Sequence, residues 1–468
     1  MSKWKLLNRI KTSSRIIKIG PLALGIVGFV VYFIRAFQFA FTQRSILDEG
    51  VYLLKGYLFT EGIYTPFQDY GFWTQKAPLS YLIYGWVQQV FTPGLRTGCF
   101  FSILIGALAI LGLFLVIRRI RGNWWAVASL WIVVFNSVTL RYFSAAMSQS
   151  LVACCLVWML FLALGRDRPG WQIHLGCLLS GIMVMTRQNM APALVLLCLY
   201  LLWQHGWKKG LLYSLVGVLP LLIIHIIYWP DILKMWTPWL PESLTPFLDR
   251  WRLPLAEWMG TTTPEPGARL QSLLEGIRFH YVAVIGGVLA LLVWSPRKYY
   301  ENDSKYWEAV FIRLLFLVLL VFHLWAGLGN SAANNNNFFT VNPYLAFFDF
   351  LGIVALACVP PDSLKRLPIY QRVLVVLLFL AATVGVGYGN FEILGDKLAN
   401  LQLPRVNEFF STWRFLPGKA VLWEILENNY GLPYEATRLL LPTLALALAG
   451  LFLVFFSLEV WLYSKRKF

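Results

Sequence analysis

The sequence predicts an all-α polytopic membrane protein with about twelve transmembrane helices and extracytoplasmic loops that carry short interfacial helices. Of its 468 residues, 58% are apolar and only 13% are charged, which is too apolar a composition for an ordinary soluble domain. Basic side chains outnumber acidic ones and give a net charge of +17. They lie mostly in short connections between apolar runs, which is typical of cytoplasmic loops and gives no indication of a nucleic-acid partner.

The first span is predicted at residues 19–41, because a mostly apolar run of 23 residues at about 1.5 Å each is long enough to cross a bilayer. The segment 1–18 is basic and is expected on the cytoplasmic side. No small-residue cleavage site follows, so the span is interpreted as a retained anchor. Arg35 lies within it; it either snorkels to the interface or binds an anionic head group.

Successive apolar runs alternate with short basic connections along the rest of the chain. Further spans are expected at roughly 98–117, 124–140, 145–164, 173–185, 190–203, 211–228, 279–294, 308–328, 341–358, 373–388 and 439–463. On this count the basic connections and both termini face the cytoplasm, as the positive-inside rule requires. The longer loops then face the outside, so we expect the active site there.

Three units follow from this topology. Residues 1–230 form a transmembrane module whose first outer loop, 42–96, is the candidate catalytic loop. Residues 231–278 form an outer loop in which tryptophans alternate with prolines, a pattern typical of interfacial helices. Residues 279–468 supply the C-terminal helices and a third outer segment, 389–437.

The first outer loop brings acidic residues to the membrane surface. Asp48 and Glu49 directly follow the first span, and Asp69 comes later in the same loop. A carboxylate at this position can accept a proton from an acceptor hydroxyl, as glycosyl transfer from a lipid phosphate requires. A structural interpretation stays open, because the spacing from Ser45 to Asp48 resembles a capping box and acids are favoured in a first helical turn.

Basic residues are predicted on the same side of the membrane. Lys76 precedes a proline that is expected to open an amphipathic helix over 79–91, while Arg141 and Arg187 fall at predicted outer ends of spans. The forked guanidinium of arginine suits phosphate oxygens. Arg187 lies in a polar break between two short apolar runs, and such a break is tolerated within a membrane where it lines a cavity. An interface anchor at Lys76 and a surface turn at Arg187 are the alternatives.

Taken in order, these motifs resemble the multi-spanning glycosyltransferases of the GT-C class, in the branch of protein O-mannosyltransferases and lipid A aminoarabinose transferases. The resemblance is carried by Asp48-Glu49-Gly-x-Tyr52, by Lys76-Ala-Pro-Leu-x-Tyr81, and by Gly181 followed by Thr186-Arg187. The resemblance covers the first 230 residues well. Over the remainder it extends only to the layout of spans and loops. Relatives often carry Lys-Pro-Pro where this chain has Lys76-Ala-Pro.

The resemblance implies an inverting transfer of a sugar from a polyprenyl-phosphate donor to an extracytoplasmic acceptor. Asp48 is then the catalytic residue, with Glu49 beside it and Asp69 as a second candidate base. Lys76 and Arg187 are the implied phosphate clamp, and Arg141 is included as a third candidate for the donor phosphate.

The sequence leaves open whether a metal is used and which of several function classes applies. No cysteine or histidine pair shows zinc-ligand spacing, and relatives differ in whether they use a divalent metal, so that question stays open. The expected partners are the lipid-linked donor, membrane lipids and the acceptor. A transporter or flippase for a lipid or sugar-lipid is the main alternative, and a non-catalytic scaffold is the other.

Overall fold

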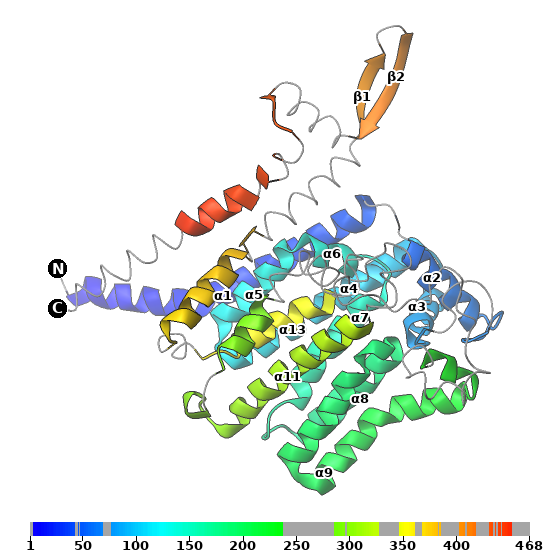
Figure 1. Cartoon of the computed structure of the whole chain (residues 1–468), viewed down its shortest axis with the longest axis horizontal. Helices are drawn as coiled ribbons and strands as arrows, with labels where there is room; N and C mark the ends of the chain where they lie inside the picture. Colours follow the sequence, from blue (N-terminus) through cyan, green and yellow to red (C-terminus); the bar gives the residue numbers. More distant parts are fainter. Residues whose placement is uncertain are drawn as a thin grey trace.

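A computed structural model of the chain describes most of its first half and parts of its second. The described residues are 3–42, 45, 47–68, 76–236, 285–294, 297–326, 346–360, 367–381, 383–384, 402–407, 410–417, 430–433, 436, 439–440 and 442–451. They form a body of packed helices with a separate pair of strands (Figure 1).

The helices follow the order expected for a multi-spanning bundle. They are α1 (Lys3–Thr42), α2 (Leu47–Thr60), α3 (Leu79–Val90), α4 (Leu95–Arg121), α5 (Asn123–Phe135), α6 (Ser137–Phe143), α7 (Ser148–Ala163), α8 (Gly170–Thr186), α9 (Ala191–Ile227), α11 (Asp303–Ala326) and α13 (Ala346–Ala357). Short 3-10 turns are η1 (Gln188–Met190), η2 (Asp231–Met235) and η7 (Arg297–Tyr299). The prediction of a helical membrane fold is therefore confirmed for this body.

Among the described residues, four helical segments are long and apolar enough to cross a membrane by length and composition: Ile19–Phe41, Leu95–Arg121, Gln188–Ile227 and Asp303–His323. Shorter apolar helices are Asn123–Phe135, Ser148–Ala163, Gly170–Thr186, Phe347–Ala357, Ile369–Ala381 and Pro442–Leu451. The predicted span at 19–41 coincides with the first of these. The count of about twelve spans is not confirmed by this set.

One predicted span, 124–140, is divided in the structure. Helix α5 ends at Phe135, and the side-chain oxygen of Asn136 accepts a hydrogen bond from the backbone N–H of Thr139 at 3.2 Å, which caps the short helix α6. Arg35 of α1 donates to the carbonyl of Val134, one of the last-turn carbonyls that a helix cannot satisfy itself. Arg35 thus joins α1 to the end of α5.

Helix α9 covers most of both predicted spans, 190–203 and 211–228. The chain bends between them at Gly206, whose φ of 76° lies outside the helical region and suits a residue without a side chain. An added Cβ at Gly210 would lie 2.5 Å from the Cα of Leu202, so the two halves meet closely after the bend.

Helices α2 and α3 of the first outer loop pack against each other through two glycines. A Cβ at Gly56 would lie 2.4 Å from the carbonyl oxygen of Tyr81, and one at Gly85 would lie 2.2 Å from the carbonyl oxygen of Gly56. Only glycine permits so close a backbone approach. The two helices lie together at one end of the bundle (Figure 1), as the prediction of helices in this loop requires.

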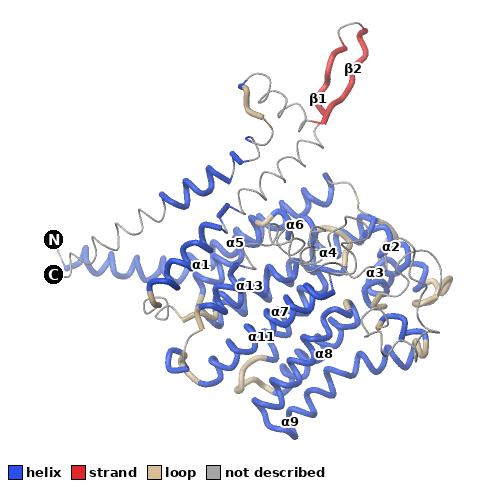
Figure 2. The backbone as a smooth tube through the Cα atoms, viewed as in Figure 1, coloured by secondary structure: helices blue, strands red, loops and turns tan. Residues whose placement is uncertain are grey.

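The third outer segment departs from the all-α prediction. Strands β1 (Gln402–Asn407) and β2 (Phe410–Pro417) pair antiparallel, and Figure 2 shows them as the strands of the described chain. Aromatic and β-branched residues recur in 402–417 and favour strand. The all-α prediction does not take this local preference into account. The loop expected at 231–278 lies outside the described residues beyond Trp236.

Candidate functional site

The acidic pair lies in the first turn of α2, which begins at Leu47. Asp48 is half-buried. Glu49 is only 5% exposed, and its carboxylate accepts hydrogen bonds from the backbone N–H of Ala146 at 2.9 Å and from the thiol of Cys99 at 3.5 Å. Glu49 therefore has a structural contact that the sequence does not predict, because its side chain joins α2 to the chain between α6 and α7.

Glu49 and Arg141 line the same small cavity, together with residues of α1 and α4. Its volume of about 20 Å³ has room for about one water molecule. A sugar does not fit there. The structure thus places Arg141 beside Glu49 at the start of α2, whereas Lys76 and Arg187 contact other residues.

Lys76 and Arg187 meet around Tyr52 and Ser148. Arg187 donates from Nη1 to the Ser148 hydroxyl at 3.2 Å, and that hydroxyl oxygen lies 3.1 Å from the hydroxyl of Tyr52. The ammonium of Lys76 lies 5.4 Å from the centroid of the Tyr52 ring, within the range of a cation–π contact. The backbone N–H of Ala77 donates to the side chain of Gln188 at 3.3 Å. Two predicted phosphate ligands, far apart in sequence, therefore lie on one side of α2.

Lys55 joins this group and was not among the predicted site residues. It lies one turn after Tyr52 on α2 and is only 6% exposed. Burial, and then the nearby charge of Lys76, lower the pKa of Lys55 to about 8. The spacing of Asp48, Tyr52 and Lys55 along one helical face is the sequence signal that places it here. Lys55 is thus close to Lys76, which lies over the Tyr52 ring, while Arg187 is linked to Tyr52 through Ser148.

The turn that carries Arg187 is supported from α11. Nδ1 of His323 contacts the carbonyl of Leu319 at 2.7 Å and, since a carbonyl only accepts, that nitrogen carries the proton. Nε2 then accepts from the side-chain amide of Asn189 at 2.7 Å. His323 and Asn189 are both buried, so this hydrogen bond fixes η1 and the Arg187 backbone beside it. Neither His323 nor Asn189 is among the site residues that the sequence predicts.

The loop between α2 and α3 is fastened to the end of α9. Lys234 of η2 donates to the carbonyl of Phe67 at 3.0 Å and pairs with Asp231 at 3.1 Å. The ring of Phe67 is buried and lies 5.9 Å from that of Tyr228. Asp69, the second candidate base, follows two residues later and lies outside the described residues.

Metal ligation was left open by the sequence. Within the described part of the chain, no group of three or more His, Cys, Asp or Glu side chains gathers in a way that could hold a metal ion.

Comparison with known proteins identifies the segment that carries Lys76 and Arg187. Residues 75–229 match the family of dolichyl-phosphate-mannose-protein mannosyltransferases. The predicted resemblance to GT-C membrane glycosyltransferases is confirmed over this segment, which includes Lys76, Arg141 and Arg187, and the match supports a transferase. No curated protein matches the chain.

Two solved structures of ArnT from Cupriavidus metallidurans match the chain. The structure bound to undecaprenyl phosphate shares 14% identity, with a TM-score of 0.45, over 92% of this chain and 75% of that one. The apo structure shares 16% identity, with a TM-score of 0.46, over 92% of this chain and 74% of that one.

Proposed function

We propose that the protein is an inverting glycosyltransferase that moves a sugar from a polyprenyl-phosphate donor to a hydroxyl of an extracytoplasmic acceptor. The observation that carries the proposal is the meeting of Lys76 and Arg187 around Tyr52, on the helix whose first turn holds Asp48. The family model over residues 75–229 supports it, since its proteins use a dolichyl-phosphate-linked sugar.

The phosphate of the donor is assigned to the three cations. Arg187 offers a planar fork to two phosphate oxygens, while Lys76 and Lys55 act as point charges. A sugar phosphodiester carries one negative charge, and the departing phosphate monoester carries up to two. The cations therefore stabilise the leaving group more strongly as the bond breaks, which is the condition for catalysis.

Asp48 is assigned as the base. It takes the proton from the acceptor hydroxyl, the acceptor oxygen attacks the anomeric carbon, and the bond from that carbon to the phosphate oxygen breaks with its electron pair on the phosphate. The anomeric centre is inverted. Glu49 positions the first turn of α2 through Ala146, and Asp69 remains the alternative base.

The proposed orientation follows the predicted topology, with both termini cytoplasmic and the α2–α3 end of the bundle outside. Reconstituted protein with a radiolabelled polyprenyl-phosphate sugar tests the activity. We expect release of polyprenyl phosphate by the wild type and none by Asp48→Asn. Translocation of intact donor across the vesicle without release would instead favour the transporter alternative.

A further inference from the structure

A second polar cavity lies at the far end of the bundle from the candidate site. Its volume is about 260 Å³, and it is lined by the end of α4, the start of α11 and the end of α13. Helix α4 contacts Glu49 through Cys99 and ends at Arg121, which is roughly 33 Å away at about 1.5 Å per residue. The cavity is therefore separate from the Lys76–Arg187 site.

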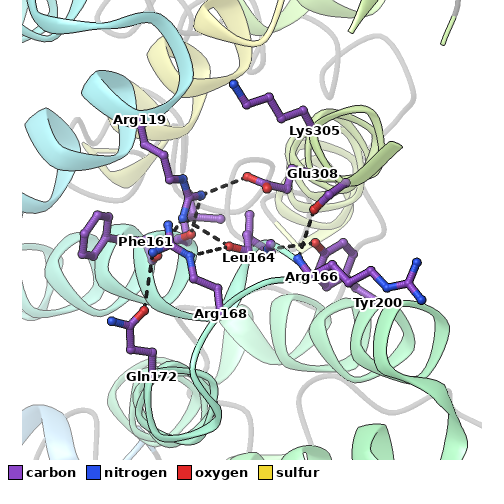
Figure 3. A network of polar contacts seen from close by, with 12 residues as sticks. Arg119, Phe161, Leu164, Arg166, Arg168, Gln172, Tyr200, Lys305 and Glu308 are labelled. Atoms are coloured by element: carbon purple, nitrogen blue, oxygen red, sulfur yellow. Dashed lines mark hydrogen bonds and ion pairs between the residues drawn. The ribbon is translucent and has the colours of Figure 1, made fainter. Parts of the chain in front are cut away.

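The charged lining contains both signs. The cations Arg119, Arg121 and Lys305 line the cavity together with the acids Glu301 and Glu308. Arg119 and Glu308 point toward one another, with Lys305 on the same helix as Glu308 (Figure 3); their ion pair is 3.0 Å long. This pair neutralises one cation with one acid.

Arg119 also closes the end of α7. Its guanidinium donates to the carbonyls of Phe161 at 2.8 Å, Leu164 at 3.1 Å and Leu160 at 3.2 Å. These are last-turn carbonyls, which have no partner within their own helix. Arg119 and Glu308 thus have structural roles, and a ligand must be bound by the other cations.

The guanidinium of Arg121 is held by a hydrogen bond from its Nε. Its Nε donates to the carbonyl of Ala357 at 2.8 Å, and its Cζ lies 5.9 Å from the ring of Trp125. This anchoring orients the side chain at the cavity wall. Lys305, one turn before Glu308, pairs with Glu301 at the cavity rim.

A fully buried arginine lies one turn deeper along the same helix. Arg313 is 0% exposed and comes four residues after Ala309, which lines the cavity, so both lie on one face of α11. Its Nη2 is 3.4 Å from the carbonyl of Val293 and its Cζ is 5.0 Å from the Trp294 ring. Within the described part of the chain, Nε and Nη1 have no hydrogen-bond partner. A buried cation of this kind is stabilised by a nearby anion.

We propose that this cavity binds the phosphate group of an anionic membrane lipid. Arg121 and Lys305 contact the phosphate, and the apolar wall formed by Ile120, Ala357 and Cys358 accommodates the part of the lipid next to it. Basic pockets between helix ends at the membrane interface are suited to such head groups. In the predicted topology this is the cytoplasmic leaflet, where the lipid joins the ends of α4, α11 and α13. The proposal is independent of the proposed function.

Thermal unfolding of the purified full-length protein in neutral detergent tests this site. Phosphatidylglycerol is expected to raise the midpoint temperature, whereas phosphatidylcholine and inorganic phosphate are not. Arg121→Gln and Lys305→Gln should at least halve the phosphatidylglycerol shift. Arg118→Gln is the matched control, because Arg118 is on the same helix but is exposed and does not line the cavity; it should keep the shift.

Native mass spectrometry gives a second readout that does not depend on stability. Each of the two cavity variants should retain one phosphatidylglycerol fewer than the wild type and the Arg118→Gln control. An equal loss in all three variants, or no loss in any, overturns the proposal by showing only general attraction to basic surface. Stabilisation by inorganic phosphate equal to that by phosphatidylglycerol also overturns it, because the ligand is then a soluble phosphate.

Discussion

Arg187 donates a hydrogen bond to the hydroxyl of Ser148 at 3.2 Å, and the same oxygen lies 3.1 Å from the hydroxyl of Tyr52. Through these contacts a turn after α8, the start of α7 and the middle of α2 are fixed relative to one another. Glu49 adds a second link between α2 and the α6–α7 connection. The acidic turn of α2 and the residues around Tyr52 are consequently linked to the same neighbouring segments.

Asp48→Asn should abolish transfer and leave the fold intact, because the amide keeps the shape of the side chain and loses the basic oxygen. A positioned base contributes about 10²- to 10⁴-fold to a rate. The measurement is turnover under saturating donor, with donor affinity measured alongside. Glu49→Ala is the comparison, and it should instead destabilise the protein by about 1–3 kcal/mol because the N–H of Ala146 loses its acceptor. Full turnover in Asp48→Asn would transfer the role of base to Asp69.

Arg187→Lys should weaken donor binding almost as much as Arg187→Ala, because a lysine cannot offer the planar fork to a phosphate. A loss of about tenfold corresponds to about 1.4 kcal/mol. Lys76→Ala should produce a loss of similar size. Titration with polyprenyl phosphate, followed by intrinsic fluorescence, measures the affinities. If Arg187→Lys binds as tightly as the wild type, Arg187 contributes charge alone.

Donor affinity should depend on pH through Lys55, whose pKa is lowered to about 8 by burial and by Lys76. Below pH 8 the ammonium is already charged and affinity should be level. Above pH 8 phosphate binding requires uptake of a proton, so affinity should fall with rising pH, by up to about tenfold per unit. Lys55→Gln should remove this dependence between pH 8 and 10. A wild-type profile that stays level over the same range would contradict the role of Lys55.

The same lowered pKa should make the stability of the protein rise with pH, whereas donor affinity should fall. The unfolded chain holds the Lys55 proton up to about pH 10.4, whereas the folded protein releases it near pH 8. Because the unfolded state then binds more protons, the contribution of Lys55 to stability should rise from pH 8 to pH 10. Thermal unfolding of wild type against Lys55→Gln over this range isolates the effect, and a difference that does not change with pH would rule it out.

Gly56→Ala should destabilise the first outer loop, because the new methyl group would lie 2.4 Å from the backbone oxygen of Tyr81. Overpacking of this kind costs about 1–3 kcal/mol. Gly50→Ala is the matched control on the same helix, since a Cβ there has nothing within 4 Å, and it should be neutral or stabilising. Thermal unfolding and turnover of both variants check this. Equal behaviour of the two would show that the α2–α3 crossing is not tightly packed.

The sequence predicted the features that depend on local chemistry. Hydrophobic length located the first span, and the proline after Ala77 located α3, since each signal acts within a few residues. Lys76 is predicted from its place before a helix-opening proline and Arg187 from a polar break between apolar runs. In the structure Lys76 lies over the Tyr52 ring, and Arg187 is linked to Tyr52 through Ser148. An acid in a first helical turn is the structural alternative for Asp48, and Asp48 lies in the first turn of α2, which begins at Leu47.

Features that depend on contacts between distant segments were not predictable in the same way. Arg141 is grouped with Arg187 by the side of the membrane predicted for both, but its cavity with Glu49 is lined by residues of α1, α2, α4 and α6. The link from His323 to Asn189 joins helices 134 residues apart, and neither residue has a local signal. The break at Asn136 was missed because its capping role is visible only once α6 is separated from α5.

The most direct test of the account is mass spectrometry of the lipids that remain bound to the purified protein. Wild type should retain a polyprenyl phosphate or its sugar conjugate, and Arg187→Ala should lose it. Arg166→Ala is the control, because Arg166 is exposed in the chain between α7 and α8, and it should retain the lipid as the wild type does. Bulk phospholipid alone in all three proteins would contradict the assignment of Lys76, Arg187 and Tyr52 as the donor site.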